Sequence, residues 1–96
     1  MELAEKVRLK PADPEGRLNF GLALLDQDHP AEAAVQFNAA LRLQPDSALA
    51  HYRLGLALAK QGNSQEAIAQ CREALRLQPD FPDAHEALEL WTHSTN

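Results

Sequence analysis

LRLQPD, the hexapeptide at residues 41–46, returns unchanged at residues 75–80, 34 positions further along the chain. When residues 14–47 are placed over residues 48–81 without a gap, fifteen of the 34 positions are identical. Unrelated sequences do not share that much, so the chain is built from a repeated unit. A period of this length predicts a solenoid, in which one supersecondary unit stacks on the next.

Each 34-residue unit is expected to form two helices, because residues that begin or end helices recur at corresponding places. Gly62 ends the first helix of the second unit, and Asn63 with Glu66 predicts an N-cap and a capping box for the next helix. Prolines stand either in a first helical turn or just after a helix end. These are Pro14, Pro30, Pro45 and Pro79. The fold class is therefore all-α.

Gly21 and Gly55 occupy the same place in the two units, in the middle of the first helix. A glycine there costs about 1 kcal/mol relative to alanine. We therefore expect a close approach of the paired helix, on which the small Ala33 and Ala67 lie.

The flanking residues continue the pattern. Residues 2–10 align with the end of a second helix, and residues 82–93 align with a first helix, so we expect one domain of six helices. In these flanks Lys6 replaces a repeated alanine and Glu89 replaces the mid-helix glycine, as suits helices without an outer partner. Two interpretations stay open: a capped, self-sufficient domain, or a piece of a longer array. The expected divisions are residues 2–10 (partial helix), 14–47 (first repeat), 48–81 (second repeat) and 82–93 (terminal helix).

The landmarks of each unit resemble those of the tetratricopeptide repeat, over nearly the whole chain. They are Phe20-Gly21, Leu54-Gly55, Ala33, Ala67, Phe37, Cys71, Ala40, Ala74, Pro45 and Pro79. Two family features differ: the usual tryptophan is Arg17 in the first unit and His51 in the second, and Asp28 replaces the turn glycine of the first unit. The resemblance implies an α-solenoid of antiparallel helix pairs, and a non-catalytic module that binds another protein or peptide.

Composition and charge exclude several classes of function. Nine Lys or Arg against fourteen Asp or Glu give a net charge of −5, and the basic residues are scattered singly, so no nucleic-acid partner is expected. The single cysteine, Cys71, excludes an internal disulfide and a thiolate metal cluster. The N-terminus lacks the apolar core of a signal peptide, and no apolar run approaches membrane-spanning length. We therefore expect no membrane insertion and a cytoplasmic location.

Residues with chemical potential lack the patterns that catalysis or metal binding requires. No glycine-rich phosphate loop, HExxH or GxSxG is present, so neither an enzyme nor a cofactor is expected. His51 and His85 take the same place in successive repeats, without the carboxylate that would complete a metal site, and are interpreted as half-buried packing residues. Cys71 is interpreted as a small core residue and Trp91 as the cover of the core at its end.

A second apolar face distinguishes the first helices of the units, since a surface helix needs only one. This candidate binding face comprises Leu18, Asn19, Leu22, Asp26, Leu49, Tyr52, Arg53, Leu56, Lys60, Glu86 and Leu90. Leu22, Leu56 and Leu90 form a ladder with one rung per repeat, and the resemblance implies that this face lines a concave groove for the ligand. The alternative is that part of the face packs against neighbouring helices in a tightly curved stack.

The composition of this face narrows the expected partner. Family members that hold the C-terminal carboxylate of chaperone tails use Lys and Asn where this chain has Leu18 and Leu22. An amphipathic helix or an extended apolar segment is therefore expected, from another protein or from a second copy. Two alternatives stay open: head-to-tail self-association through the terminal helices, and a targeting or regulatory segment of a larger enzyme, such as a glycosyltransferase or kinase.

Overall fold

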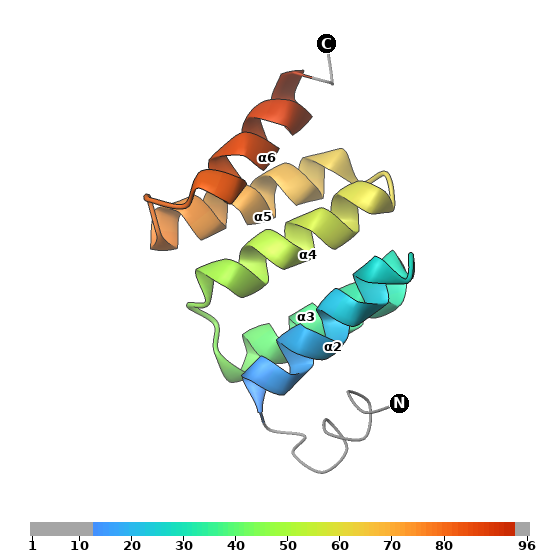
Figure 1. Ribbon diagram of the computed structural model, residues 1–96. Helices are drawn as coiled ribbons and strands as arrows, with labels where there is room; N and C mark the ends of the chain where they lie inside the picture. The colour runs from blue at the N-terminus through green and yellow to red at the C-terminus, as the bar shows by residue number, and fades with distance from the viewer. Residues whose placement is uncertain (1–12, 94–96) are drawn as a thin grey trace.

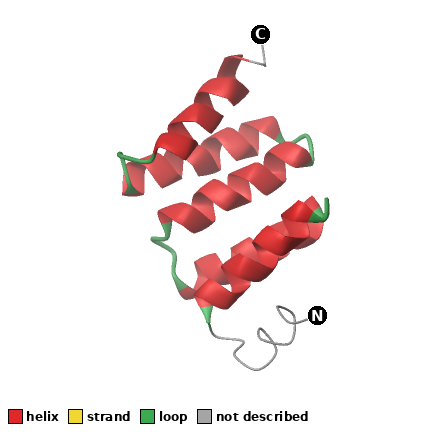
Figure 2. Ribbon diagram, in the orientation of Figure 1, coloured by secondary structure: helices red, strands yellow, loops and turns green. Residues whose placement is uncertain are grey.

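Residues 13–93 are described in the computed structural model, and they form helices joined by short turns, without strands (Figure 2). The helices are α2 (Pro14–Asp26), α3 (Pro30–Leu43), α4 (Ala48–Lys60), α5 (Ser64–Leu77) and α6 (Pro82–His93). The all-α prediction is confirmed. Five of the six expected helices lie in the described part of the chain, and the one expected at residues 2–10 lies outside it.

The helices follow one another in a zigzag (Figure 1). Each helix packs mainly on its neighbours in the chain, and α2 also touches α4. The first helices of the units, α2 and α4, thereby form one layer with α6, and the second helices, α3 and α5, form the other. This arrangement is an α-solenoid, in which each unit contacts only the next. Within residues 13–93, no helix combines the length and apolar character that a bilayer crossing requires.

Helix starts of two kinds alternate along the chain. At the start of α2, Asp13 accepts a backbone hydrogen bond at 3.1 Å, and at the start of α4 Ser47 does the same at 3.1 Å. At α3 and α5 the N-cap residues, His29 and Asn63, make no side-chain capping bond. Asn63 therefore stands at the predicted N-cap, but the predicted capping bond is wrong.

Backbone geometry at the N-caps explains the difference. The ψ angle is 107° at Asp13 and 105° at Ser47, in the extended region that aims a side chain at the first free N–H groups. It is 67° at His29 and 68° at Asn63. Both of these residues belong to the tight turn inside a unit, and that turn fixes their backbone.

Backbone hydrogen bonds close both tight turns. Asp28 has φ +63° and Gly62 has φ +84°, both left-handed. The next N–H reaches back to the carbonyl oxygen of Leu24 at 2.8 Å in the first unit and of Leu58 at 2.9 Å in the second. This pattern is the Schellman motif, which satisfies the last free carbonyls of a helix. The first unit thus makes the same turn without the glycine.

The mid-helix glycines lie at close helix contacts, as predicted. A Cβ atom at Gly21 would lie 2.4 Å from Cε1 of Phe37, a side chain of α3 that is fully buried. A Cβ atom at Gly55 would lie 3.1 Å from the Ala67 carbonyl oxygen and 3.4 Å from the ring of Trp91. The aromatic ring over the glycine thus comes from the same unit in the first case and from α6 in the second.

Cys71 takes the place of Phe37 in the second unit and is fully buried. Its thiol donates a hydrogen bond to the Ala84 carbonyl oxygen at 2.9 Å, which links α5 to α6. Burial raises the pKa of the Cys71 thiol. The interpretation of Cys71 as a small core residue is confirmed.

Candidate partner-binding surface

Leu18 is the residue of the candidate binding face that the fold buries. Its side chain is 8% exposed and belongs to the apolar cluster of α2, α3 and α4. Because α2 contacts both α3 and α4, two of its faces are covered, whereas a lone surface helix would cover one. Leu18 is therefore a core residue, and its inclusion in the binding face is a wrong prediction.

The other ten residues of the face keep part of their surface exposed. The exposed ones are Asn19, Asp26, Leu49, Lys60, Glu86 and Leu90, and the half-buried ones are Leu22, Tyr52, Arg53 and Leu56. Along the leucine ladder, Leu22 and Leu56 are half-buried, while Leu90 on α6 is 65% exposed. The open end of the ladder therefore lies at α6.

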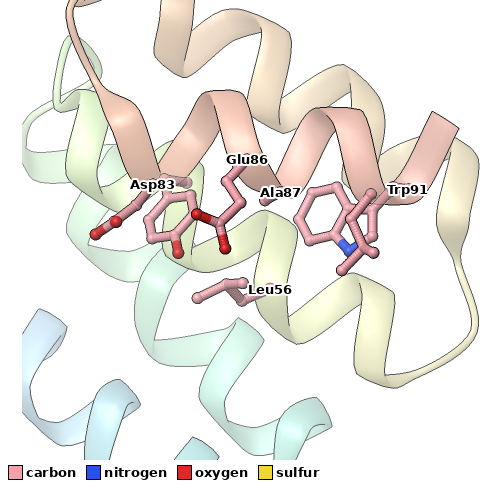
Figure 3. A pocket seen from close by; sticks show the side chains of 7 residues that line it. Leu56, Asp83, Glu86, Ala87 and Trp91 are labelled. Atoms are coloured by element: carbon pink, nitrogen blue, oxygen red, sulfur yellow. The ribbon is translucent and has the colours of Figure 1, made fainter. Parts of the chain in front are cut away.

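A pocket of about 210 Å³ lies between α4 and α6. Its lining residues are Tyr52, Leu56, Asp83, Glu86, Ala87, Leu90 and Trp91. Figure 3 shows Asp83 and Glu86 at one end of the pocket and Trp91 at the other, with Leu56 facing them from α4. The pocket thus joins an acidic end to an apolar end.

Four residues of the candidate face meet in this pocket: Tyr52, Leu56, Glu86 and Leu90. The structure does not bring the α2 residues of the face, or Leu49, Arg53 and Lys60, into the lining. Ala87 and Trp91 were missing from the predicted face, on which helical rotation does place Asp83. Asp83, Ala87 and Trp91 recur every fourth residue, so helical i, i+4 spacing was the signal that would have placed all three on one side of α6.

Tyr52 forms the wall of the pocket on α4. Its ring packs on Phe81, with ring centroids 5.1 Å apart and a tilt of 55°, an arrangement that aromatic pairs favour. Burial raises the pKa of the Tyr52 phenol, the negative charges of Asp83 and Glu86 raise it further, and Arg53 acts in the opposite direction. The phenol therefore stays protonated at neutral pH, as a hydrogen-bond donor beside two carboxylates.

The charged groups around the pocket are not neutralised by one another. Asp83 and Glu86 are exposed, and among residues 13–93 neither forms an ion pair. Arg53 is half-buried on α4, and burial lowers the pKa of its guanidinium, which stays charged. No ion pair joins Arg53 to either carboxylate in this part of the chain. The acidic end of the pocket can therefore accept a cation from outside.

The histidines connect successive units. The Nε2 atom of His51 donates to the Pro45 carbonyl oxygen at 3.0 Å, and the Nε2 atom of His85 donates to that of Pro79 at 2.8 Å. The Nδ1 atom of His51 also lies 2.8 Å from Oε1 of Gln70. His51 is half-buried as interpreted, whereas His85 is exposed because no second helix follows α6 in the described residues. Within residues 13–93, no group of three His, Cys, Asp or Glu is placed to hold a metal.

Comparison with known families identifies the repeat. The sequence profile of the tetratricopeptide repeat matches residues 18–82, more than half of the chain. The chain belongs to the tetratricopeptide repeat family. The resemblance seen in the residues is thus confirmed. Tetratricopeptide repeats generally serve as non-catalytic modules for protein–protein interaction.

Solved tetratricopeptide structures are similar over most of this chain. YrrB, a protein with an unusual peptide-binding site, matches with a TM-score of 0.87 and 32% identity, over 91% of this chain and 45% of its own. MamA matches with a TM-score of 0.89 and 27% identity, over 97% and 54%. A mutant O-GlcNAc transferase of Thermobaculum terrenum matches with a TM-score of 0.90 and 28% identity, over 95% and 18%.

This chain thus spans about half the length of YrrB and MamA and a smaller part of the transferase. No curated protein sequence matches it.

Proposed function

We propose that this tetratricopeptide domain binds a peptide or helix of a partner protein on the layer of α2, α4 and α6, with the pocket between α4 and α6 as the main anchor. The observation that carries this proposal is the exposed apolar surface at the pocket. Leu90 is 65% exposed at its edge, next to the half-buried Leu56 and Trp91. Apolar surface gathered at one hollow and bordered by polar groups is typical of an interaction site.

The size of the pocket favours a chain segment over a small molecule. Pockets for small ligands measure about 300–1,000 Å³, and this pocket measures about 210 Å³. That space suits one large side chain, while the rest of a peptide lies across the neighbouring helices. Exposed polar residues of the layer, among them Asn19 and Lys60, then set the direction of the segment.

Self-association through the terminal helix is less well supported. A following helix would cover the side of α6 that carries His85 and Glu89, the residues that correspond to His51 and Gly55 in the second unit. Both are exposed and polar. A copy docked there would have to bury the Glu89 carboxylate, and burial of a charged group is costly.

Display of random peptides on the purified domain tests the proposal, with Leu90→Gln as the test variant. Val35→Gln is the matched control, because Val35 on α3 is 62% exposed and lies outside the pocket. Peptides enriched on the unmodified domain should bind Leu90→Gln at least about tenfold more weakly, since burying one apolar side chain contributes about 1.5–3 kcal/mol. They should bind Val35→Gln unchanged.

Circular dichroism should show the same helix content for both variants. The proposal is wrong if no peptide is enriched, or if the enriched peptides bind the two variants equally well.

A further inference from the structure

The acidic end of the pocket favours an occupant that carries positive charge. Asp83 and Glu86 lie one turn apart on α6 and both face the pocket beside the apolar group of Leu56 (Figure 3). Burial raises the pKa of the Tyr52 phenol, and the negative charges of these two carboxylates raise it further. An anionic segment that entered here would meet two like charges, those of Asp83 and Glu86.

The position of Asp83 in the first turn of α6 has a structural benefit of its own, because acidic groups stabilise helix N-termini. That benefit does not require the second carboxylate. Glu86 lies beyond the first turn, and it is exposed without an ion pair among the described residues. The two carboxylates lie at the mouth of an apolar pocket and form no ion pair among the described residues. They therefore complement a ligand in which a cation stands next to an apolar side chain.

We propose that the pocket between α4 and α6 selects a basic peptide segment. One large apolar side chain of the segment enters between Tyr52, Leu56 and Trp91, and a neighbouring Lys or Arg pairs with Asp83 and Glu86. This inference rests on the proposed peptide-binding function and adds the chemistry of the partner. The net charge of −5 acts in the same direction, because it attracts basic segments at long range.

Trp91 provides a direct measurement, because it is the only tryptophan of the chain and lines the pocket. The probe is a short blocked peptide with a central leucine flanked by lysines and alanines, which has no fluorescence of its own. Two control peptides carry glutamates in place of the lysines, or alanine in place of the leucine. Each is titrated into the domain at an ionic strength of about 0.01 M and again at about 0.15 M, where the Debye length falls from about 30 to about 8 Å.

The lysine peptide should shift the Trp91 emission in a saturable manner, and more weakly at the higher ionic strength. Replacing its leucine should weaken binding about tenfold. The glutamate peptide should leave the emission unchanged over the same range of concentration.

A matched pair of double variants separates local pairing from net charge. Asp83→Asn with Glu86→Gln removes both carboxylates of the pocket. Asp46→Asn with Glu66→Gln removes one Asp and one Glu that are exposed, lie near other helix starts and do not line the pocket. The pocket variant should bind the lysine peptide about tenfold more weakly, the effect of two ion pairs near the upper end of the usual range. The control variant should bind it nearly as well as the unmodified domain.

Four results would overturn the inference: equal weakening in both double variants, equal binding of the glutamate peptide, no response of Trp91 to the lysine peptide, or an emission shift on concentrating the domain without peptide. The last would identify a second copy as the occupant. Equal binding of the glutamate peptide would leave peptide capture intact, because that function is judged separately by the Leu90→Gln variant.

Discussion

Replacing Gly21 with alanine places a methyl group where the ring of Phe37 already lies. The new Cβ would meet three ring atoms at 2.4, 2.8 and 2.9 Å, whereas carbon atoms in favourable contact lie about 3.5–4.0 Å apart. Phe37 is fully buried, so its ring has no free space to enter. Overpacking of this kind typically costs about 1–3 kcal/mol, and a contact with three atoms belongs at the upper end.

Alanine also stabilises a helix by about 1 kcal/mol relative to glycine, which offsets part of that cost. We therefore expect Gly21→Ala to lower the free energy of unfolding by about 2 kcal/mol. For a domain of this size, the corresponding fall in Tm is about 8–16 °C. Thermal and urea unfolding followed by circular dichroism measure both quantities.

Gly55→Ala is the matched control, since its Cβ would lie 3.1 Å from the Ala67 carbonyl oxygen and 3.4 Å from the nearest ring atoms. Its smaller overlap and its gain in helix propensity should nearly cancel, which leaves a change within about 0.5 kcal/mol. A Phe37→Leu background should reduce the cost of Gly21→Ala, because the smaller side chain makes room. The explanation is refuted if Gly21→Ala is as stable as the unmodified domain, or if its cost is the same in the Phe37→Leu background.

Three further predictions concern single residues. Gly62→Ala should lower the free energy of unfolding in urea by about 1 kcal/mol, because a side chain there meets open space but strains the left-handed backbone. Asp28→Gly should not lower it. A Gly62→Ala domain as stable as the unmodified one would contradict the assigned turn. Alkylation of Cys71 at mildly alkaline pH should be slow in the folded domain, because burial and a raised pKa limit the thiolate, and mass spectrometry should show rapid reaction only after unfolding in urea. Ultraviolet absorbance should show Tyr52, the only tyrosine, ionising above its ordinary pKa of 10.0 and closer to it in Asp83→Asn. Because the folded state holds the Tyr52 proton more tightly, this contribution to stability is complete below pH 10 and is lost as the pH rises through the folded pKa. Equal titration midpoints in the unmodified domain and in Asp83→Asn would contradict the assigned proximity of Asp83 to Tyr52.

The fold was predictable because the residues that begin and end helices recur at corresponding positions of the two repeats. Pro30 begins a helix, and Gly62 ends one through a left-handed turn. Local rules were less reliable where the stack decides the geometry. Asn63 is a favourable N-cap residue, but the tight turn before α5 sets its ψ to 68° and prevents the capping bond.

The sequence predicted which residues share a helix face better than it predicted how far each of them is buried. Helical rotation places Leu18 and Leu90 on equivalent faces, yet Leu18 is 8% exposed and Leu90 is 65% exposed. The difference arises from neighbouring helices: α4 and α3 cover α2, whereas α6 packs mainly on α5. Rotation about one helix axis carries no information about what lies beside the helix, so it cannot separate a core leucine from an exposed one.

The ring of Trp91 over Gly55 makes the second unit depend on a helix beyond it. In the first unit Phe37 supplies that ring from within, so the unit holds its own interior together. Repeat arrays fray from their ends. Because α4 also packs on α3 and α5, amide hydrogens of α6 should exchange before those of α4, and fraying of α6 should remove only the Trp91 ring from Gly55. A ligand in the pocket bridges α4 and α6 as well. A ligand that binds only when α6 is docked therefore stabilises the docked helix, and the tighter it binds, the more rarely α6 frays.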